Sequence, residues 1–390
     1  MGKIQYGDLI TSIEVIDDYT LRFNLTQYNN RLLQSYGYGI YFFSPTATET
    51  NGKEWARSHP VGTGAFKVVD FKRDAYWKLE RNENYWRPGR PYLDGMDIRF
   101  IPQETTGSAT LEAGELDAWF GPQTKKTVLE LVDKGFKTYP SGLWLYNYVP
   151  DATNPDSPFA NKKVRQAVEY AINREELAKA ITLGLGEASY QMAPPGAAVY
   201  DPDYKGRPYD PEKAKQLLAE AGYPDGFQTS IYCINFADLL LLNTAVSNFL
   251  KDVGIEAKVE SADMGRFLTM QTEGWKNGLN QNLVMISQPN YLVHFLDSFG
   301  PLPTRTTLAS FGRSPEYEAL CDQVKLAQND ESERAIVKEM IGMVDEEATL
   351  IPLFLSPVNP MLQPYVHPYI YPETGIQASG FYFEWWMEKH

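Results

Sequence analysis

The segment SPFANKKVRQAVEYAINREEL, Ser157–Leu177, marks the point in the chain where a helical pattern of apolar residues begins. From Asn161 onward the apolar residues recur every three or four positions, as they do along one face of an α-helix. These residues are Val164, Ala167, Val168, Ala171 and Ile172. Asn173 then supplies an N-cap side chain, with Glu176 three residues later as in a capping box. The segment therefore predicts two consecutive helices, the second beginning at Asn173.

The chain after this segment alternates between helical and strand patterns. A helix is expected to begin at Asp210, an N-cap residue followed by Pro211, and to end at Gly222. A strand, a helix and a strand follow: Thr229–Cys233, Asp238–Val253 and Ile255–Val259. This β-α-β order predicts two parallel strands joined by a helical crossover. Farther on, Glu316–Glu347 has a helical pattern, and LIPLFL, Leu350–Leu355, predicts a short buried strand.

The chain before the quoted segment consists of short alternating runs, which are typical of strands. Residues Ile13 to Leu25 alternate around Asp17-Asp18 and predict a β-hairpin with one buried face. Three further runs have the same pattern: HPVGTGAFKVVDF (59–71), YWKLERN (76–82) and MDIRFIP (96–102). Strand spacing gives way to helix spacing near Pro150, where we expect a domain boundary.

Length and charge limit the possible functions. A chain of 390 residues is long enough for two or three domains of about 100–200 residues. The formal net charge of −14 argues against a nucleic-acid partner, because phosphate recognition requires clustered Lys and Arg. Aromatic residues make up 13% of the chain, which suits stacking faces in a binding site but also suits a core.

Targeting and cysteine signals are few. The sequence contains no apolar run of the roughly 18–20 residues that a membrane helix requires. The first residues, MGKIQYGDLI, contain neither the apolar region of a signal peptide nor a lipid-attachment cysteine, so we expect an export signal to lie outside this sequence. Cys233 and Cys321 are compatible with buried apolar side chains, with one disulfide bond or with free thiols.

Signals for catalysis and for metal binding are also weak. No pair of the four histidines has metal-ligand spacing, and the sequence contains neither CxxC nor GxSxG. Glu112, Glu115 and Asp117 offer an acid/base pair of the glycosidase type, but a chain with 50 acidic residues produces such spacings by chance. We therefore expect no catalytic residue, no metal site and no cofactor.

Several of these motifs, in this order, resemble the family 5 extracellular solute-binding proteins, the peptide- and nickel-binding group of ABC importers. Together they cover the chain from about Ile13 to its end. The motifs are HPVGTGAFKVVDF, LERNENYWRPGRPYLDGMDIRFIP, TLEAGELDAWF, SPFANKKVRQAVEYAINREEL, YDPEKAKQLLAEAGYPDGF, LKDVGIEAKVE and EEATLIPLF.

The resemblance implies an α/β fold of the type II, cluster C periplasmic-binding-protein class, with two lobes and mixed sheets. Residues 50–149 and 356–390 are expected to form lobe I, and residues 150–355 lobe II. Residues 1–49 are expected to be the remnant of a small extra domain. Because the chain starts almost at the hairpin, we expect the first lobe to be truncated.

The resemblance also implies a function without catalysis. Such proteins trap a ligand between their lobes by hinge closure, and a membrane permease recognises the closed form. The expected partners are a small-molecule or peptide ligand and an ABC permease, and the expected protein is a monomer that binds no nucleic acid. The expected location is outside the cytoplasm, either periplasmic or lipid-anchored at the cell surface.

The stretch MISQPNYLVHFL, Met285–Leu296, bears on the ligand. In peptide-binding members the similar stretch usually holds an aspartate that pairs with the ammonium group of the peptide, and this position falls on Gln288. An amide cannot provide that charge-assisted bond, so a neutral polyol, an oligosaccharide or a blocked oligopeptide fits better than a free amine. Asn290 and Tyr291 belong to the same candidate site. The alternative is that Gln-Pro-Asn forms a local turn.

Four further residues complete the candidate site, each with a structural alternative. Trp119 follows the LEAGELDA motif, where core packing explains the ring equally well. Trp144 and Tyr146 alternate in GLWLYNY, so they share one face that points either to the ligand or to the opposite layer. Asn235 follows the strand TSIYCI at the carboxyl edge where α/β sheets bind ligands, although a plain turn explains it too.

Two other classes of function remain as alternatives. A sensory or regulatory module could use the same fold, because a fold does not determine a function. A carbohydrate-active enzyme would need two carboxylates about 5–10 Å apart across the binding site.

Overall fold

The computed structural model describes residues 9–30, 32, 42–121, 124–286, 295, 299, 308–370 and 382–388. By its internal contacts the chain divides into two units. Unit 1 comprises Met1–Tyr38 and Leu143–Ser356, and unit 2 comprises Gly39–Gly142 and Pro357–His390. We expected boundaries after residues 49, 149 and 355, and the assignment of these units to the two lobes stays a prediction.

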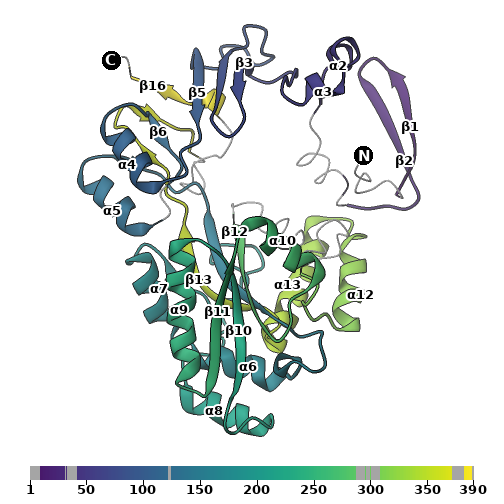
Figure 1. Ribbon diagram of the computed structural model, residues 1–390. Coiled ribbons are helices and arrows are strands. Elements are labelled where there is room, and N and C mark those ends of the chain that lie inside the picture. Colours follow the sequence, from purple (N-terminus) through teal and green to yellow (C-terminus); the bar gives the residue numbers. More distant parts are fainter. Residues whose placement is uncertain are drawn as a thin grey trace. The chain divides into compact units, whose positions relative to one another are not determined.

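A six-stranded mixed sheet forms the centre of unit 1 (Figure 1). In sheet order its strands are β11 (Ile255–Ala262), β10 (Phe227–Ile234), β12 (Gly278–Ile286), β8 (Leu143–Pro150), β13 (Ile351–Pro357) and β9 (Glu187–Ala188). β10 runs parallel to β11 and to β12, whereas β8 runs antiparallel to β12. The predicted parallel crossover is confirmed, since a helix joins β10 to β11. β13 confirms the predicted buried strand.

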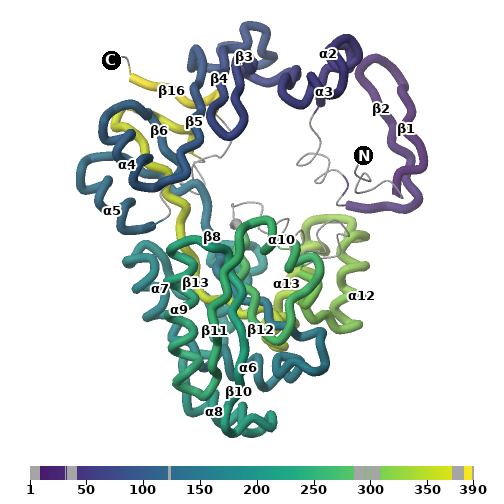
Figure 2. The backbone as a smooth tube through the Cα atoms, in the orientation of Figure 1, coloured from purple at the N-terminus to yellow at the C-terminus, as the bar shows by residue number. Residues whose placement is uncertain are grey.

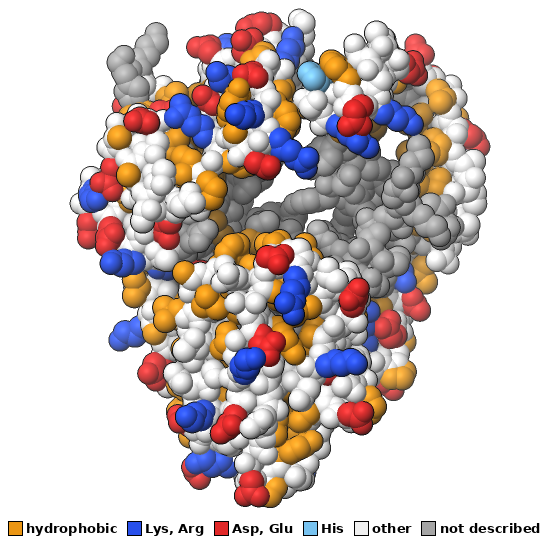
Figure 3. Space-filling view, viewed as in Figure 1, with side chains coloured by type: hydrophobic (Ala, Val, Ile, Leu, Met, Phe, Trp, Pro, Cys, Tyr) orange, Lys and Arg blue, Asp and Glu red, His pale blue; other side chains and the backbone are white. Residues whose placement is uncertain are grey.

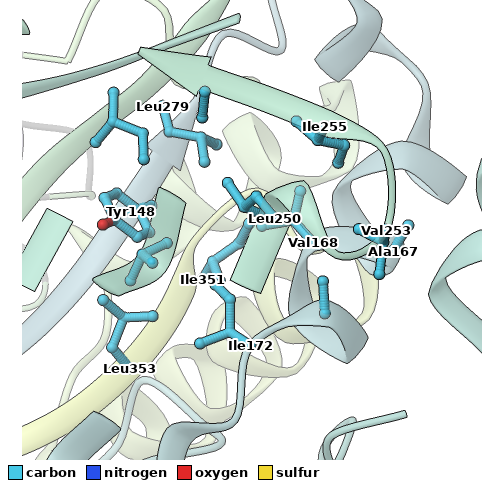
Figure 4. Packing of buried hydrophobic residues seen from close by; sticks show 14 of the residues in the cluster. Tyr148, Ala167, Val168, Ile172, Leu250, Val253, Ile255, Leu279, Ile351 and Leu353 are labelled. Atoms are coloured by element: carbon cyan, nitrogen blue, oxygen red, sulfur yellow. The ribbon is translucent and has the colours of Figure 1, made fainter. Parts of the chain in front are cut away.

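Helices cover both faces of this sheet. One apolar cluster joins the sheet to α6 (Lys162–Ala171), α7 (Arg174–Thr182), α8 (Pro211–Glu220) and α9 (Ala237–Lys251) (Figure 4). The second cluster includes α12 (Pro315–Val324) and α13 (Asp330–Glu347), while α10 (Met264–Glu273) contacts β10 and β11. Neighbouring residues of β8 enter opposite clusters, Tyr148 the first and Leu145 and Val149 the second. A strand buried on both faces in this way reads as a nearly continuous apolar run.

The two helix starts predicted from local capping, at Asn173 and Asp210, are confirmed, and α6 also begins at a capping residue, Asn161. Asn161 accepts a hydrogen bond from the backbone N–H of Lys163, and Asn173 accepts one from Glu176, 3.1 Å away. Asp210 caps α8 by accepting from the N–H of Lys213 at 2.9 Å. Each cap satisfies an N–H group that has no partner inside the first helical turn.

The helical pattern predicted over Glu316–Glu347 is confirmed in α12 and α13, although the chain leaves the helical conformation between them. Asn329 adopts an extended conformation, with φ of −157° and ψ of 167°. Its side chain accepts from the N–H of Ser332, and the Ser332 hydroxyl contacts the N–H of Asn329 in return. This capping box starts α13 afresh, and a periodicity argument that ignores caps overlooks it.

The N-terminal hairpin forms as predicted, from β1 (Ile10–Asp17) and β2 (Thr20–Leu25), but the expected buried face is wrong. Val15 is 75% exposed, and Ile13 and Leu21 on the same face are more than half exposed. The following segment, which also belongs to unit 1, contacts the end of α12, where the N–H of Asn30 donates to the carbonyl of Lys325 at 2.9 Å. Alternation therefore identified the strands correctly but not what covers them.

The described residues of unit 2 form two three-stranded sheets and a strand pair (Figure 2). The first sheet has the order β3 (Phe66–Lys72), β4 (Tyr76–Arg81), β5 (Gly95–Arg99), which confirms the three predicted runs. The second has the order β6 (Ala118–Trp119), β14 (Met361–Leu362), β7 (Lys137–Thr138), and β15 (Val366–His367) pairs with β16 (Trp386–Met387). Its helices are α2 (Pro45–Asn51), α3 (Lys53–Ala56), α4 (Glu104–Glu112) and α5 (Lys125–Asp133). Because β14 is the central strand of the second sheet, that sheet depends on the return of the chain after Ser356.

The two cysteines, the charged surface and the membrane-spanning potential were also considered from the sequence. Cys233 and Cys321 are both buried free thiols, and burial raises the pKa of Cys233 to about 11. Acidic and basic side chains are interspersed over the face shown in Figure 3. None of the helices in the described part of the chain is long and apolar enough to cross a membrane.

Candidate functional site

The sheet of unit 1 brings two of the predicted site residues to one edge. β10, β11 and β12 are parallel, so their carboxyl ends lie at the same edge. β8 runs the opposite way, and its second residue, Trp144, pairs with Met285 near the end of β12. Asn235 directly follows β10. Trp144 and Asn235, which are far apart in the sequence, therefore belong to the same edge of the sheet, which we call the carboxyl edge.

Trp144 and Tyr146 are both half-buried, and their alternation on β8 puts them on one face. The Tyr146 ring stacks on the ring of Phe354, with centroids 4.5 Å apart and planes 18° apart. Burial, helped by the charge of Asp238, raises the pKa of Tyr146 well above its usual range. The phenol therefore stays protonated at physiological pH and can donate a hydrogen bond.

The turn after β10 holds Asn235 at the surface. Its backbone N–H donates to the carbonyl of Ala262 at 2.9 Å, which joins the turn to the end of β11. The residue is exposed, so its amide can both donate to and accept from a ligand. Phe236, also exposed, follows as the N-cap of α9 and makes no side-chain capping bond.

Asp238 lies in the first turn of α9 and was missed by the sequence reasoning. Its Oδ1 accepts from the N–H of Leu239 at 3.0 Å. A carboxylate there offsets the positive end of the helix, so the carboxyl edge favours a neutral or cationic group over an anion. The signal that would have identified it is an acidic residue three positions after Asn235, in the helix that follows the carboxyl end of a strand.

Three of the predicted site residues, Gln288, Asn290 and Tyr291, lie outside the described residues. The neighbouring amides of β12 are described, and two of them are buried inside the sheet layers. Asn280 is fully buried and Gln281 is 2% exposed. Among the described residues neither amide atom of Asn280 has a hydrogen-bond partner, whereas Asn282 donates to Oδ1 of Asn147 at 3.4 Å. These amides belong to the interior rather than to the carboxyl edge.

Trp119, the remaining predicted residue, belongs to unit 2. It is 6% exposed, and its ring packs so closely against Gly107 and Gly121 that a Cβ atom at either glycine would overlap it. This packing favours the core alternative. Trp119 nevertheless lines a cavity of about 470 Å³ between β5 and β6.

Metal binding has little support in the described part of the chain. No three His, Cys, Asp or Glu side chains come together there in a way that could hold an ion. What the carboxyl edge of unit 1 offers is an aromatic ring, an amide, a protonated phenol and a carboxylate, a set suited to holding a polar organic solute.

Comparison of the amino-acid sequence with known proteins identifies relatives of this chain. The profile of the "Bacterial extracellular solute-binding proteins, family 5 Middle" matches residues 2–296. Heme-binding protein A of Haemophilus influenzae is 29% identical over 399 residues, which cover 96% of this chain and 70% of that protein. Glutathione-binding protein GsiB of Shigella flexneri is 34% identical over 260 residues, or 66% of this chain. The matched part is 50% of the length of GsiB.

Comparison with solved structures identifies proteins with a similar fold. The periplasmic binding protein DppA from Helicobacter pylori, in complex with the peptide STSA, has a TM-score of 0.81 and 26% identity. The match covers 98% of this chain and 75% of DppA. NikA from Brucella suis, in complex with Fe(III)-EDTA, also has a TM-score of 0.81, at 19% identity, over 98% of this chain and 80% of NikA. The expected α/β fold of periplasmic binding proteins with mixed sheets is thereby confirmed.

Proposed function

The chain belongs to family 5 of the bacterial extracellular solute-binding proteins, and from this membership we propose that it is the binding component of an ABC importer. In this role it captures a small solute outside the cytoplasm and delivers it to a membrane permease. The proteins of this family bind solutes and catalyse no reaction, so the expectation that the chain is not an enzyme is confirmed. The match to the family over residues 2–296 carries the proposal.

The proposed ligand is a small peptide or a peptide derivative. Asp238 provides a carboxylate at the carboxyl edge of unit 1, where it can accept a charge-assisted bond from an α-ammonium group. One relative is named for glutathione, itself a tripeptide derivative, and DppA was solved with a tetrapeptide. A neutral oligosaccharide is the competing ligand, because Gln288 stands where peptide-binding members usually hold an aspartate.

Each residue of the carboxyl edge has a distinct proposed role. Trp144 stacks on an apolar part of the ligand, and Asn235 provides both a donor and an acceptor. The protonated phenol of Tyr146 donates to a ligand carbonyl, while Asp238 pairs with the ammonium group. Gln288, Asn290 and Tyr291 stay proposed contacts from the sequence.

Thermal unfolding of the purified chain tests the proposal, because a ligand that binds only the folded state raises the unfolding temperature. The ligands to screen are glutathione, free and N-acetylated tri- and tetrapeptides, maltotriose, hemin and a nickel chelate. Free peptides or glutathione are expected to raise the transition, and N-acetylation or Asp238→Asn to weaken binding by about tenfold. Glu256→Gln is the matched control, since Glu256 is exposed and lies at the opposite end of β11.

The possible outcomes test the identity of the ligand separately from the proposed role in an importer. A rise with maltotriose alone would overturn the peptide assignment and favour the amide at Gln288. Equal weakening by Asp238→Asn and Glu256→Gln would remove Asp238 from the site. Uptake of the identified ligand, measured in cells that carry the chain with its permease, distinguishes an importer from a sensory module, which would bind the ligand without supporting uptake.

A further inference from the structure

The chain passes between unit 1 and unit 2 at three places, of which the structure describes two. One described crossing lies between Gly142 and Leu143, where β8 begins, and the other between Ser356 and Pro357, at the end of β13. The third, at Tyr38–Gly39, lies outside the described residues. Because the two described crossings lie at strand ends, any bending there has to be taken up by a few residues.

On the unit 1 side of these crossings, both strands are held by pairing. Leu143 pairs with Ile286 on β12, and Leu355 pairs with Glu187 on β9. β8 and β13 are also neighbours in the six-stranded sheet. A paired residue cannot change its backbone angles without disturbing the sheet, so we assign both strands to unit 1 as far as Leu143 and Leu355.

On the unit 2 side, the two crossing segments pair with each other. The N–H of Ser141 donates to the carbonyl of Val358 at 2.9 Å, and the N–H of Val358 donates to the carbonyl of Gly142 at 2.9 Å. Val358 thus uses its N–H and its carbonyl in this pairing. The chain then forms β14, the central strand of a sheet in unit 2. The returning chain is therefore part of unit 2 from Val358 onward.

Lys125, the first residue of α5, binds the same segment through its side chain. Its ammonium group donates to the carbonyl of Pro357 and to Oδ1 of Asn359, the latter at 3.0 Å. The positive charge strengthens both bonds. Asn359 is 8% exposed, so water competes little for the ammonium group at this point.

The start of α5 is itself well anchored in unit 2. Thr124 is the N-cap residue and accepts from the N–H of Thr127 at 3.4 Å. Its own N–H and hydroxyl both donate to Oε1 of Glu104, at 3.1 and 2.9 Å, which joins α5 to the start of α4. Val128 and Leu131 bury the inner face of the helix. Lys125 therefore connects the returning chain to a firmly packed helix.

We propose that Lys125 is a positioning residue for the closing motion of the protein. By holding Pro357 and Asn359 to α5, it confines bending at the two described crossings to Gly142 and Ser356. The inference rests on the proposed function, because a protein that closes on its solute needs a defined pivot.

The two pivot residues suit this role for different reasons. Gly142 has a φ of 153°, and glycine accepts the widest range of backbone angles. Ser356 lies between two residues that cannot turn easily. Leu355 is paired with β9, and Pro357 has a φ fixed by its ring and a carbonyl held by Lys125. Without Lys125 the bend could spread into the segment that follows Pro357.

Spin-label distances and hydrogen exchange test the proposal on the whole chain without a ligand. Nitroxide labels are attached at Lys67→Cys in unit 2 and Lys258→Cys in unit 1, two exposed positions, while the native cysteines are buried. Lys125→Met removes the ammonium group and keeps the length of the side chain. It is expected to widen the distance distribution about twofold and to speed exchange of the Ser141 and Val358 amides about tenfold, since local opening becomes easier.

Lys137→Met is the matched control. Lys137 makes the same kind of bond, from its ammonium group to the carbonyl of Pro364, but farther along the returning chain. This variant is expected to leave the distance distribution and both exchange rates as they are in the parent chain. Lys125→Arg keeps the charge and is expected to restore most of the restraint.

The proposal is overturned if Lys125→Met leaves the distance distribution as narrow as in the parent chain, even with faster exchange, because Lys125 would then stabilise only its own surroundings. Equal broadening in Lys137→Met, or a parent distribution as broad as that of Lys125→Met, would overturn it too. If Lys125→Met does not fold, Asn359→Ala removes one of the two acceptors and is expected to show the same broadening to a smaller degree. None of these measurements uses a ligand, so their failure is distinct from a failure of the proposed ligand to bind.

Discussion

The rings of Tyr146 and Phe354 stack with their centroids 4.5 Å apart, and this contact joins β8 to β13. These two strands are neighbours in the sheet of unit 1. β8 begins directly after the boundary at Gly142, and β13 ends at Pro357, one residue past the boundary after Ser356. The stacked pair therefore packs β8 against β13, the two strands that lie at the unit boundaries, beside the residues proposed to hold the ligand.

Removing the Tyr146 ring is expected to destabilise unit 1. Tyr146→Ala loses the stack and part of an apolar cluster, which predicts a loss of about 2–4 kcal/mol in the free energy of unfolding. Tyr146→Phe keeps the ring and is expected to stay within about 1 kcal/mol of the parent chain. Urea unfolding followed by tryptophan fluorescence measures both.

Tyr19→Ala is the control for the loss of a tyrosine ring, because Tyr19 is 99% exposed. If Tyr146→Ala unfolds at the same urea concentration as Tyr19→Ala, the stack contributes nothing to stability. In that case the role of Tyr146 is in ligand binding and not in stability.

Local patterns predicted the helices and parallel strands of unit 1 well, because the signals are themselves local. Asn173 and Asp210 each cap a helix within four residues, and the apolar stripe of α6 shows a burial pattern of period 3.6. Residues close together in the sequence determine where such elements begin and which face they bury. The capping box at Asn329 is equally local, and only the weaker Ser332 in place of Glu or Gln hid it.

The candidate site was harder to predict, because residues distant in the sequence form it. Trp144 and Asn235 share an edge only through the order β10-β12-β8, which no local pattern encodes. The hairpin illustrates the same limit, since alternation detects two faces but cannot say which face another segment covers. Asp238 was overlooked because an acidic residue in a first helical turn also serves the helix itself.

Asn280 is expected to be a stability defect. Its amide is fully buried on β12 between Val149 and Tyr232, and neither of its polar atoms has a hydrogen-bond partner in the part of the chain that the structure describes. Asn280→Val removes the unsatisfied groups and introduces a good strand residue, so we expect a gain of about 1–2 kcal/mol in unfolding free energy. Thermal unfolding by calorimetry measures the change.

The comparison variant is Asn282→Val, because the Asn282 amide donates to Asn147 and its loss leaves Asn147 with fewer bonds. That variant is expected to be neutral or destabilised. Should Asn280→Val also lower the transition temperature, a bound water or solute already satisfies the amide of Asn280.

A buried ionic cluster holds α6 against the segment around Arg207. Glu169 is 2% exposed and accepts from Nη1 of Arg207 at 2.7 Å, while Nη2 of Arg174 lies 3.5 Å from its other oxygen. Glu169→Gln leaves the guanidinium of Arg174, itself 1% exposed, without a counter-charge. We expect a loss of about 3 kcal/mol or more, because a buried charge is costly once its partner is removed.

Glu220→Gln provides the matched control for this substitution. Glu220 pairs with Lys163 at 2.9 Å on the surface, where water screens the pair, so little change in the urea midpoint is expected. If the two variants lose equal stability, the buried cluster is no more important than a surface pair.

Asp345 makes the stability of unit 1 depend on pH. The residue is 3% exposed, and burial together with the charge of Glu169 raises the pKa of its carboxyl well above the ordinary value of 3.8, although Arg207 and Arg174 oppose the rise. The folded state therefore holds its proton at pH values where the unfolded state has lost it. The unfolding free energy then falls as pH rises above about 4, by at most about 1.4 kcal/mol per pH unit for this one group.

Asp345→Asn removes the titration and keeps an oxygen for the N–H of Met192, which lies 3.4 Å from Oδ1. The variant and the parent chain should unfold at similar urea concentrations near pH 4, and the variant should become progressively more stable than the parent toward pH 7. Urea midpoints at each pH, compared between the two chains, cancel the contributions of all other titrating groups. A variant that is less stable at pH 7, with a difference that shrinks on acidification, would mean that the carboxyl is ionised in the folded state and that Arg207 and Arg174 outweigh its burial.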